Sequence, residues 1–491
     1  MFSRGLWGYL PANILQGLIG FATLMVFTRV LTPEAYGIYA LTFGVSSLAQ
    51  TAFFTWIEAS MARFYPAHAR DDTEAPVLYG TLYRLFIGVA LLFGAVCITG
   101  LVLWPAHTPS AHALKTAIAL GLGSVVARSL AKLVQEQRKS EGRVAMAAMI
   151  DMSQTVGAFV IGVGCALAGV GGASPVLGGG LIALFLLPFI VREDWGRAIR
   201  GRFERAQAVQ FAYYGFPVSA SLILTLALYT ADRFLIAHFL NDAEAGAYHA
   251  GFSLASRILD VLFIWFGAAG APAMVHALEN GGEAALKATA RHQLRTIAFV
   301  LFPAVGGLVM VAPSLGGLLI GEGLRDQALG VTPLIALGAL FSGLNTYYFL
   351  QAFTLARKTR LLVAAMSVPA ISNIGLNLAL IPVMGLQGAA LASAISFGLG
   401  LAASWGLGLN TLRLPVPLTD LAKTAACVLV MMAVLAVMPR WGGIAELAAK
   451  SLTGMAIYGA LAWLLDLNDM RAPTLAIINR LRAKVFARAT S

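Results

Sequence analysis

Charged residues are scarce in this sequence. Asp, Glu, Lys and Arg make up only 12% of the 491 residues, whereas 59% of the residues are hydrophobic. A soluble protein carries about 25% charged residues, so half of the charge that a water-exposed surface needs is missing. Apolar runs of about 20 residues recur along the chain and leave no stretch long enough for a soluble domain. These deficits exclude a soluble globular protein and predict one all-α polytopic membrane domain.

Cysteine is also rare, and sequence motifs for catalysis are missing. Cys97, Cys165 and Cys427 lie far apart within apolar segments, so they predict small core residues and not a disulfide framework or a metal site. The sequence contains no GxSxG, Walker, HExxH or CxxC motif, and its seven histidines form no cluster. We therefore name no catalytic residue, no metal ligand and no cofactor.

The connections between the apolar runs are short, which bears on a second class of function. An integral-membrane glycosyltransferase or polysaccharide polymerase would need a sizeable loop outside the membrane with paired carboxylates or Arg-rich sites. The predicted outer connections, such as 169–175 and 382–387, are short and rich in small residues. They leave no room for an active site, so we predict transport and not enzymatic chemistry.

The hydropathy pattern predicts about fourteen membrane spans. Twelve of them lie at roughly 9–31, 36–57, 79–103, 112–134, 144–168, 174–191, 210–234, 244–267, 293–316, 330–354, 362–382 and 387–409. Two more lie at about 418–438 and 445–466. We expect an N-terminal lobe at 1–191, a cytoplasmic linker at 192–209, a C-terminal lobe at 210–412, two additional spans within 413–466 and a basic amphipathic tail at 467–491. The tail is predicted to lie on the anionic inner leaflet.

One pattern occurs twice at a fixed distance in the sequence. The run Leu31-Thr32-Pro33-Glu34-Ala35-Tyr36-Gly37-Ile38-Tyr39 is followed 209 residues later by Leu240-Asn241-Asp242-Ala243-Glu244-Ala245-Gly246-Ala247-Tyr248. The shift places the first predicted span on the seventh, so the repeating unit has six helices. Because six is even, both lobes have the same orientation, as in a parallel repeat about an axis near the membrane normal. Two pseudo-symmetric six-helix lobes are typical of a transporter.

Positive charge is distributed unevenly between the predicted connections. With the N-terminus inside, 25 of the 34 Lys and Arg residues fall on the cytoplasmic side, six fall outside and three lie within spans. Cytoplasmic loops carry the excess of Lys and Arg in membrane proteins, so both termini are predicted to be cytoplasmic. The same distribution explains the net charge of +11 by membrane orientation and not by nucleic-acid binding.

Several charged residues lie inside the predicted spans or at their ends. A charge near the bilayer centre costs roughly 2.5–3.5 kcal/mol on insertion scales, and retained charges usually face a partner or a wet cavity. The arginines are Arg29, Arg84, Arg128, Arg233 and Arg257, and the carboxylates are Asp151, Asp232 and Asp260. A surplus of guanidinium groups in a cavity suits an anionic ligand, especially a phosphate, because the planar fork makes bidentate contacts. The predicted substrate-binding residues are Arg29, Arg84, Arg233 and Arg257.

Simpler roles stay open for most of these charges. Arg128 with Asp151, and Arg257 with Asp260 at i, i+3 spacing, would satisfy each other as ion pairs. Such pairs would stabilise the helix bundle without touching a substrate.

Arg29 and Arg233 end equivalent spans, so their side chains would also reach the outer interface by snorkelling. Arg84 has no neighbouring carboxylate in its own span, which favours a cavity-facing role.

Uncharged polar residues in the C-terminal lobe allow two interpretations. Asn373 and Asn377 share one helix face, and Tyr347 and Tyr348 lie in the preceding span. These side chains would hydrogen-bond sugars or act as polar contacts between helices, and the second role is favoured.

Three segments resemble a known family. The run Thr28-Arg29-Val30-Leu31-Thr32-Pro33-Glu34-Ala35-Tyr36-Gly37-Ile38-Tyr39 resembles the opening signature of the polysaccharide transporter family, which contains the O-antigen and exopolysaccharide flippases. Asp232-Arg233 followed by Ala245-Gly246-Ala247-Tyr248 resembles the second-lobe signature of that family. The segment from Asn377 to Ala392 is similar to one shared across the wider MOP superfamily, which includes the MATE drug exporters and the lipid II flippases.

The resemblance implies a fold, a substrate and an energy source. It implies two six-helix lobes in a V shape that alternate access to a central cavity. It implies that an oligosaccharide on undecaprenyl pyrophosphate moves from the inner to the outer leaflet of the bacterial cytoplasmic membrane. An H⁺ or Na⁺ gradient would drive transport in such a family, and this would give Asp151, Asp232 or Asp260 a role in ion coupling.

The resemblance also bears on partners and on an alternative function. The expected partners are the lipid-linked oligosaccharide, the bilayer and the polymerase and glycosyltransferases of the same pathway, and the chain is expected to act as a monomer. The alternative is a MATE-like, ion-coupled exporter of small organic cations. Carboxylates would dominate the cavity of such an exporter, whereas arginines outnumber carboxylates here.

Overall fold

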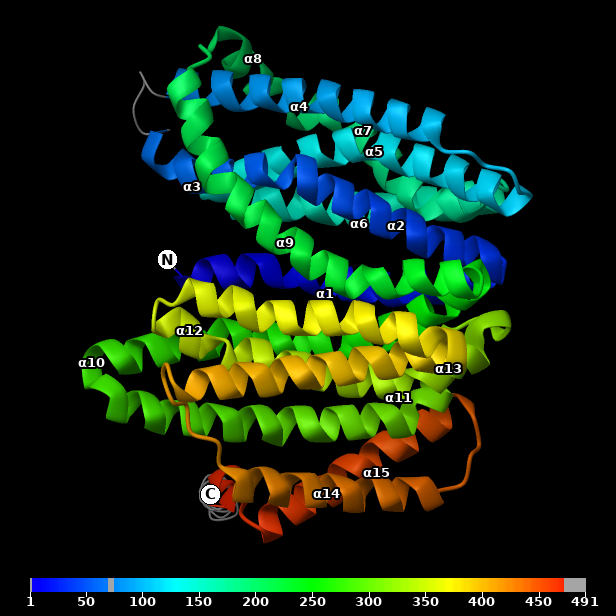
Figure 1. Cartoon of the computed structure of the whole chain (residues 1–491), viewed down its shortest axis with the longest axis vertical. Coiled ribbons are helices and arrows are strands. Elements are labelled where there is room, and N and C mark those ends of the chain that lie inside the picture. The colour runs from blue at the N-terminus through cyan, green and yellow to red at the C-terminus, as the bar shows by residue number, and fades with distance from the viewer. Residues whose placement is uncertain (1, 69–74, 472–491) are drawn as a thin grey trace, which may run out of the picture. The chain divides into compact units, whose positions relative to one another are not determined.

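A computed structural model describes residues 2–68 and 75–471 of the protein, and within these ranges all regular secondary structure is helical (Figure 1). The predicted basic tail at 467–491 therefore lies outside the described residues from position 472 onward. The first helices are α1 (Phe2–Val30), α2 (Pro33–Phe53), α3 (Thr55–His68), α4 (Ala75–Leu103), α5 (Pro109–Ser140), α6 (Val144–Leu167), η1 (Gly171–Ala173), α7 (Ser174–Ile190), α8 (Arg192–Arg200) and α9 (Arg205–Phe239). The remaining helices are α10 (Asp242–Leu319), α11 (Glu322–Leu344), η2 (Asn345–Phe349), α12 (Gln351–Leu355), α13 (Thr359–Leu409), α14 (Leu418–Val437), α15 (Gly443–Leu464) and η3 (Leu467–Asp469).

Two helices begin at the same Thr-Pro signal. The Thr32 hydroxyl accepts a hydrogen bond from the Ala35 N–H at 3.2 Å, and Pro33 occupies the first turn of α2. Thr108 caps α5 in the same way, with Pro109 as its first residue. A threonine side chain satisfies a free N–H at the helix start, and proline fits there because it needs no hydrogen bond from its own nitrogen.

The longest helices are divided by glycines with left-handed backbone. Helix α10 has 78 residues and contains Gly282 at φ 67° and ψ −160°. A straight helix of that length would measure about 117 Å, several times the roughly 30 Å of hydrocarbon in a bilayer. Figure 1 shows α10 turning back on itself. Helix α13 is divided in the same way at Gly385, with φ 59°.

The described residues include eleven helices long and apolar enough to cross a membrane. Helices α2 and α3, which are bent by 47° where they meet, bring the number to twelve if they form one span. The chain is therefore a multi-pass, all-helical membrane protein, as predicted.

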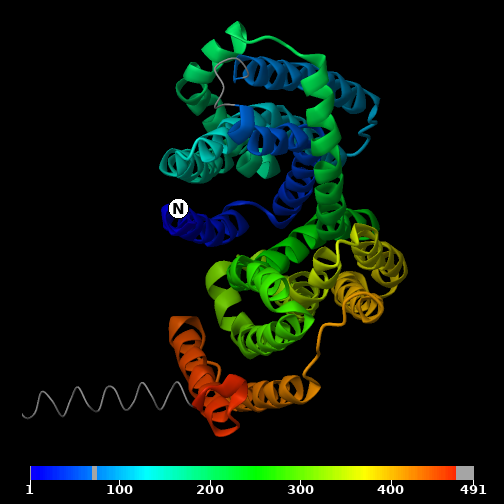
Figure 2. The ribbon, with the colours of Figure 1, turned by 90° about the vertical axis from the view of Figure 1, so that its left-hand side faces the viewer.

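The first of two compact units contains residues 1–250 and 320–327. Within it, α7 packs on α5 and α6, and α9 lies along α2 and α3 (Figure 2). Glycines allow the α7 backbone to approach its neighbours: a Cβ at Gly178 would lie 2.5 Å from the Ala158 carbonyl oxygen, and one at Gly180 would overlap Ser124. Small residues at helix contacts are the usual means of close packing in membranes.

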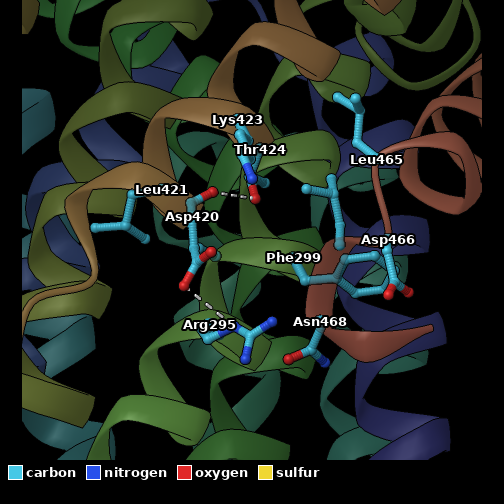
Figure 3. A pocket seen from close by; sticks show the side chains of 11 residues that line it. Arg295, Phe299, Asp420, Leu421, Lys423, Thr424, Leu465, Asp466 and Asn468 are labelled. Atoms are coloured by element: carbon cyan, nitrogen blue, oxygen red, sulfur yellow. Dashed lines mark hydrogen bonds and ion pairs between the residues drawn. The ribbon is translucent and has the colours of Figure 1, made fainter. Parts of the chain in front are cut away.

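The second unit contains residues 251–319 and 328–491, in which α14 and α15 pack on α10. The Tyr458 hydroxyl donates to the Phe299 carbonyl oxygen at 2.7 Å. Figure 3 shows Arg295 of α10 beside Asp420 of α14 at a cavity of about 30 Å³, which has room for about one water molecule. Arg295 also makes two contacts with the Asp469 carboxylate, at 3.0 and 3.2 Å. These contacts fix the last two long helices to α10.

Candidate functional site

The two copies of the repeated pattern meet in the first unit. A Cβ at Gly37 of α2 would overlap the backbone oxygen of Asp242, and a Cβ at Gly246 of α10 would lie 2.8 Å from the Gly37 nitrogen. Gly37 and Gly246 are the residues that the 209-residue shift makes equivalent. The absence of side chains at both positions thus allows α2 and the start of α10 to touch backbone to backbone.

A buried polar cluster lies on the helices that meet at this crossing. We call it the signature cluster, and its members are Tyr36, Tyr39, Asp232, Arg233, Tyr248 and His249. The Tyr248 hydroxyl donates to Asp232 Oδ2 at 2.7 Å. The His249 ring centroid lies 5.8 Å from that of Tyr36 and 5.7 Å from that of Tyr39. The cluster therefore joins both signature segments through titratable and aromatic side chains.

Burial separates the signature cluster from the molecular surface. Asp232 and Arg233 are each 4% exposed. Arg233 interacts electrostatically with Tyr248, Asp232, Tyr36 and Tyr39, so it does not reach the outer interface by snorkelling. A carboxylate and a guanidinium side by side at this depth balance each other's charge, because an uncompensated buried charge is strongly destabilising.

Arg29 lies at a cleft in the same unit. Its side chain is exposed, and Nη1 donates to the Met25 carbonyl oxygen at 2.7 Å. The cleft has a volume of about 550 Å³ and is also lined by Pro33, Glu322 and Arg325. The Gly321 N–H donates to the Thr28 hydroxyl at 2.9 Å at the same place. Arg29 is therefore accessible to a ligand from this cleft.

Arg84 lies against the segment that follows α8. Its Nη2 donates to the Gly201 carbonyl oxygen at 2.9 Å, although the side chain is exposed overall. A Cβ at the neighbouring Gly80 would lie 2.6 Å from the Arg202 nitrogen. The start of α4 thus holds the segment after α8 by direct backbone contact, with Arg84 beside it.

The structure does not join Arg128 and Asp151 as an ion pair. Asp151 Oδ2 accepts a hydrogen bond from Gln16 Nε2 at 2.5 Å. The Arg128 side chain instead crosses Gly179 of α7, with Nε 3.7 Å from where a Cβ would be. The interpretation of these two residues as mutual partners is wrong.

Arg257 and Asp260 lie one turn apart on α10 in the second unit. Arg257 is half-buried and Asp260 is exposed. They interact electrostatically, but no direct ion pair forms between these two described side chains. Asp260 also interacts with Tyr347. Both charged groups are thus free of a close mutual contact and accessible from the surface of their unit.

The asparagines of α13 connect its two halves. Asn377 Nδ2 donates to Asn373 Oδ1 at 3.1 Å, and Asn373 Nδ2 donates to the Ser393 hydroxyl at 3.2 Å. Asn373 and Asn377 are buried, and Ser393 lies beyond the turn at Gly385. The prediction of polar contacts between helices is confirmed for these residues.

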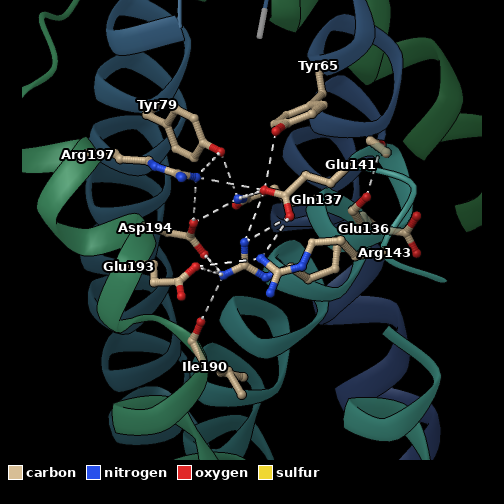
Figure 4. A network of polar contacts seen from close by, with 12 residues as sticks. Tyr65, Tyr79, Glu136, Gln137, Glu141, Arg143, Ile190, Glu193, Asp194 and Arg197 are labelled. Carbon is tan, nitrogen blue, oxygen red and sulfur yellow. Dashed lines mark hydrogen bonds and ion pairs between the residues drawn. The ribbon is translucent and has the colours of Figure 1, made fainter. Parts of the chain in front are cut away.

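The largest polar network joins α5 to α8 and was not predicted (Figure 4). Arg138 is 1% exposed and makes ion pairs with Asp194 at 2.8 Å and with Glu141 at 3.0 Å. Gln137 Nε2 lies 2.8 Å from Asp194 Oδ1 and 2.9 Å from Glu141 Oε1. We call Gln137, Arg138, Glu141 and Asp194 the α5–α8 network.

The two carboxylates of this network have shifted pKa values. Burial raises the pKa of Asp194, and the contacts with Gln137 and Arg138 oppose that shift. Burial acts in the same direction on Glu141, but hydrogen bonds from Gln137 and Arg138 outweigh it and lower the pKa of Glu141. The Arg197 guanidinium lies over the Tyr79 ring at 5.5 Å. The network therefore holds α8 against α4 and α5 through the ion pairs of Arg138 and the hydrogen bonds of Gln137.

No group of three or more His, Cys, Asp or Glu side chains in the described ranges is arranged to hold a metal ion. The residues described above offer arginine, carboxylate and aromatic side chains, which can bind anions and polar groups.

The fold is similar to those of membrane transporters. It matches "Lipid II flippase MurJ, inward closed conformation" with a TM-score of 0.74 and 15% identity, covering 93% of this chain and 98% of that chain. It matches an inward-facing multidrug resistance MATE family transporter with a TM-score of 0.63 and 15% identity, covering 84% and 96%. A MOP superfamily transporter from Pyrococcus furiosus has a TM-score of 0.52 and 14% identity, covering 83% and 92%. The chain therefore has the fold of these transporters.

The sequence places the chain more narrowly. The family model described as "Polysaccharide biosynthesis protein" matches residues 26–328, which is more than half of the chain and includes both signature segments. No curated protein sequence matches the chain. The protein belongs to the polysaccharide biosynthesis protein family, and the resemblance seen in the sequence is confirmed.

Proposed function

We propose that this protein is a flippase for lipid-linked oligosaccharides, which moves glycan on undecaprenyl pyrophosphate from the inner to the outer leaflet by alternating access. The observation that carries the proposal is the family match over residues 26–328 in a chain with a transporter fold. A polysaccharide is built from precursors that are made on one side of the membrane and used on the other. A transporter of this family therefore suits the transfer of the precursor.

The proposed pyrophosphate contacts are made by arginines. Arg257 is half-buried without a direct ion pair, and Arg29 opens on a cleft. Both suit an anion better than the enclosed Arg233, for which we propose an indirect role through the signature cluster. Arg84 is proposed to contact the substrate near the start of α4, where it donates to the Gly201 carbonyl oxygen in this structure.

Ion coupling is proposed at Asp151, Asp232 and Asp260, with Asp232 supported most by its surroundings. Its carboxylate is buried and accepts a hydrogen bond from Tyr248, so gain or loss of a cation there would alter the contact between α9 and α10. We expect Asp232→Asn to lower the stability of the protein, because the buried Arg233 loses its counter-charge, and to remove the response of transport to an imposed H⁺ or Na⁺ gradient in vesicles that contain the folded variant. The matched control is Asp326→Asn, which changes an exposed carboxylate. An unchanged gradient response in Asp232→Asn would exclude this residue from coupling.

The proposed topology has fourteen crossings, a cytoplasmic N-terminus and a cytoplasmic C-terminus. It counts α10 and α13 as two crossings each, because each has a left-handed glycine within it. We place the chain in the bacterial cytoplasmic membrane as a functional monomer that hands its substrate to the polymerase of the pathway.

Deletion of the gene tests the proposed function. In a deletion strain, the lipid-linked oligosaccharide should still be made but should stay inaccessible to a membrane-impermeant sugar-modifying reagent added from outside. Expression of the intact chain should restore access. A strain that lacks the lipid-linked precursor altogether would contradict the flippase and support a role in its synthesis, and normal precursor export with loss of cation resistance would support the MATE-like alternative.

A further inference from the structure

A π-helical turn places one tyrosine of the second unit in an unusual position. Helix η2 spans Asn345–Phe349, and the Leu350 N–H donates to the Asn345 carbonyl oxygen at 2.9 Å, five residues back. Single π-helical turns inside longer helices are frequent at functional sites. The wider turn here is supported from α10, because Gln293 Nε2 donates to the Tyr347 carbonyl oxygen at 3.2 Å.

Tyr347 forms a rigid aromatic pair with Phe263 of α10. Their ring centroids lie 5.4 Å apart and the planes differ by only 13°. Two glycines hold the rings: a Cβ at Gly267 would lie 2.7 Å from Tyr347 Cε1, and one at Gly343 would overlap the Phe263 ring. Phe263 is buried beneath Tyr347, which stays half-buried. We call Phe263 and Tyr347 the aromatic platform, and its geometry is fixed before any ligand binds.

Charged and polar groups surround the platform. Asp260 is exposed, precedes Phe263 by three residues and interacts electrostatically with both Tyr347 and Arg257. Two buried atoms on residues next to Tyr347 make no hydrogen bond within the described part of the chain: Gln293 Oε1, on the residue that donates to the Tyr347 carbonyl, and Asn345 Oδ1, in the π-helical turn itself. Buried polar atoms usually have partners, so both acceptors are open to a hydrogen-bond donor from a ligand or a water molecule.

The position of the platform along α10 agrees with binding from the inner leaflet. Helix α10 begins at Asp242, on the predicted outer side, and rises 1.5 Å per residue. Asp260 is then about 27 Å and Gly267 about 37 Å from the start of the helix, against a hydrocarbon thickness of roughly 30 Å. Asp260 is thus near the far end of the hydrocarbon core, where a charged side chain can reach headgroups or water. The platform therefore lies toward the predicted cytoplasmic end of its helix.

We propose that Tyr347, Phe263 and Asp260 form a subsite for a neutral sugar ring of the transported glycan. The platform offers its aromatic surface to the C–H face of a pyranose, while the Asp260 carboxylate accepts hydrogen bonds from sugar hydroxyls. Arg257 is six residues before Phe263, about 9 Å along the helix axis, and a diphosphate followed by a sugar is long enough to span that separation. This subsite rests on the proposed flippase function. It assigns recognition of the sugar to residues of α10 and η2.

Paired binding measurements test the subsite. The full-length chain in nanodiscs is titrated with undecaprenyl pyrophosphate bearing the oligosaccharide, and separately with undecaprenyl pyrophosphate that bears no sugar. Tyr347→Leu and Asp260→Asn should each weaken binding of the glycan-bearing lipid by about tenfold, as expected when contacts to a bound group are lost. Binding of the sugar-free lipid should stay the same. Tyr347→Phe should lose less, since it keeps the ring.

Two controls keep the outcome interpretable. Tyr213→Leu changes a tyrosine that is 86% exposed on α9 and should leave both affinities unchanged. Asp260→Asn alters an exposed side chain and carries the test alone if Tyr347→Leu does not fold. Equal weakening for both lipids, or no change for either, would overturn the sugar subsite while leaving the flippase intact. If the unaltered chain binds neither lipid, the proposed function itself is overturned.

Discussion

Gly37 and Gly246 are positions where a single methyl group has a large effect. Gly37→Ala would push a Cβ into the Asp242 backbone, which cannot move without shifting the start of α10. Forcing extra methyl groups into a tight contact typically costs about 1–3 kcal/mol. We expect Gly37→Ala and Gly246→Ala to lower the thermal unfolding temperature of the purified protein and to reduce transport.

A second glycine serves as the control for this prediction. Gly88 of α4 has no atom within 4 Å of the place where a Cβ would be, and alanine is the better helix former. Gly88→Ala should therefore leave the unfolding temperature unchanged or raise it slightly. If Gly37→Ala behaves in the same way, the crossing of α2 and α10 is looser than the structure shows.

A double variant tests whether Arg257 of α10 acts on the substrate or only neutralises Asp260. Arg257→Ala should abolish export while the protein still accumulates in the membrane, and Arg257→Lys should keep part of the activity because it keeps charge without the planar fork. Because no direct ion pair joins Arg257 to Asp260, we expect Arg257→Ala with Asp260→Ala to stay inactive. Export measured in cells answers this, with Arg440→Ala as an exposed control.

Recovery of export in the double variant would have a clear meaning. It would show that Arg257 serves only to neutralise Asp260, as two coupled charges that can be removed together. Arg257 would then be excluded from the pyrophosphate contact.

At the scale of helices, the α5–α8 network holds α8, which is the first part of the predicted linker between the lobes. Removing one partner of a buried ion pair leaves the other charge unpaired and typically costs about 3–5 kcal/mol. We expect Arg138→Met to loosen α8 and to make the bonds around Gly201 more sensitive to proteolysis. Lys287→Met is the control, because Lys287 and Glu283 form an exposed pair on α10 that should contribute about 1 kcal/mol or less.

Equal proteolysis in Arg138→Met and in the unaltered chain would show that α8 is held by other contacts. Those contacts would then include the backbone approach of Gly80 to Arg202.

The sequence allowed us to predict the repeated helices and the residues that are equivalent in them. It did not allow us to predict which charged helix ends contact each other. The 209-residue shift identified Gly37 and Gly246 as equivalent, and the structure places them in contact. By contrast, Arg138, Glu141 and Asp194 lie at polar helix ends, where charges are normally solvated. They are buried where α8 packs on α4 and α7 beside the end of α5, and no local pattern encodes that packing.

A second pair of charges that was not predicted lies on α15. Glu446 and Lys450 form an ion pair at i, i+4 on α15, with both side chains buried. The charge distribution counted Lys450 only as one of the six positive charges on the outer side, whereas the i, i+4 spacing indicates a pair with Glu446. The turns at Gly282 and Gly385 lie in two of the predicted connections, between spans 244–267 and 293–316 and between spans 362–382 and 387–409.

At the scale of the whole molecule, orientation is the property that the charge distribution predicts most directly. We expect reporter domains fused after Ser491, or inserted near Arg200, to be active only when the reporter requires the cytoplasm. The physical reason is that Lys and Arg are retained on the cytoplasmic side during insertion. Activity of an export-dependent reporter at either position would contradict the predicted orientation, and a fusion near Arg440 provides the outside control.

The contact between Gly37 and Gly246 also has a consequence for the history of the chain. Equivalent residues of two copies touch one another only near the axis that relates the copies, as residue i meets its own counterpart in a two-fold symmetric dimer. A chain with one copy of the pattern could make the same contact between two separate molecules. We therefore expect that the chain can be cut within the linker at 201–204 and produced as two polypeptides. The two should reassemble in the membrane through the contact of Gly37 with Gly246.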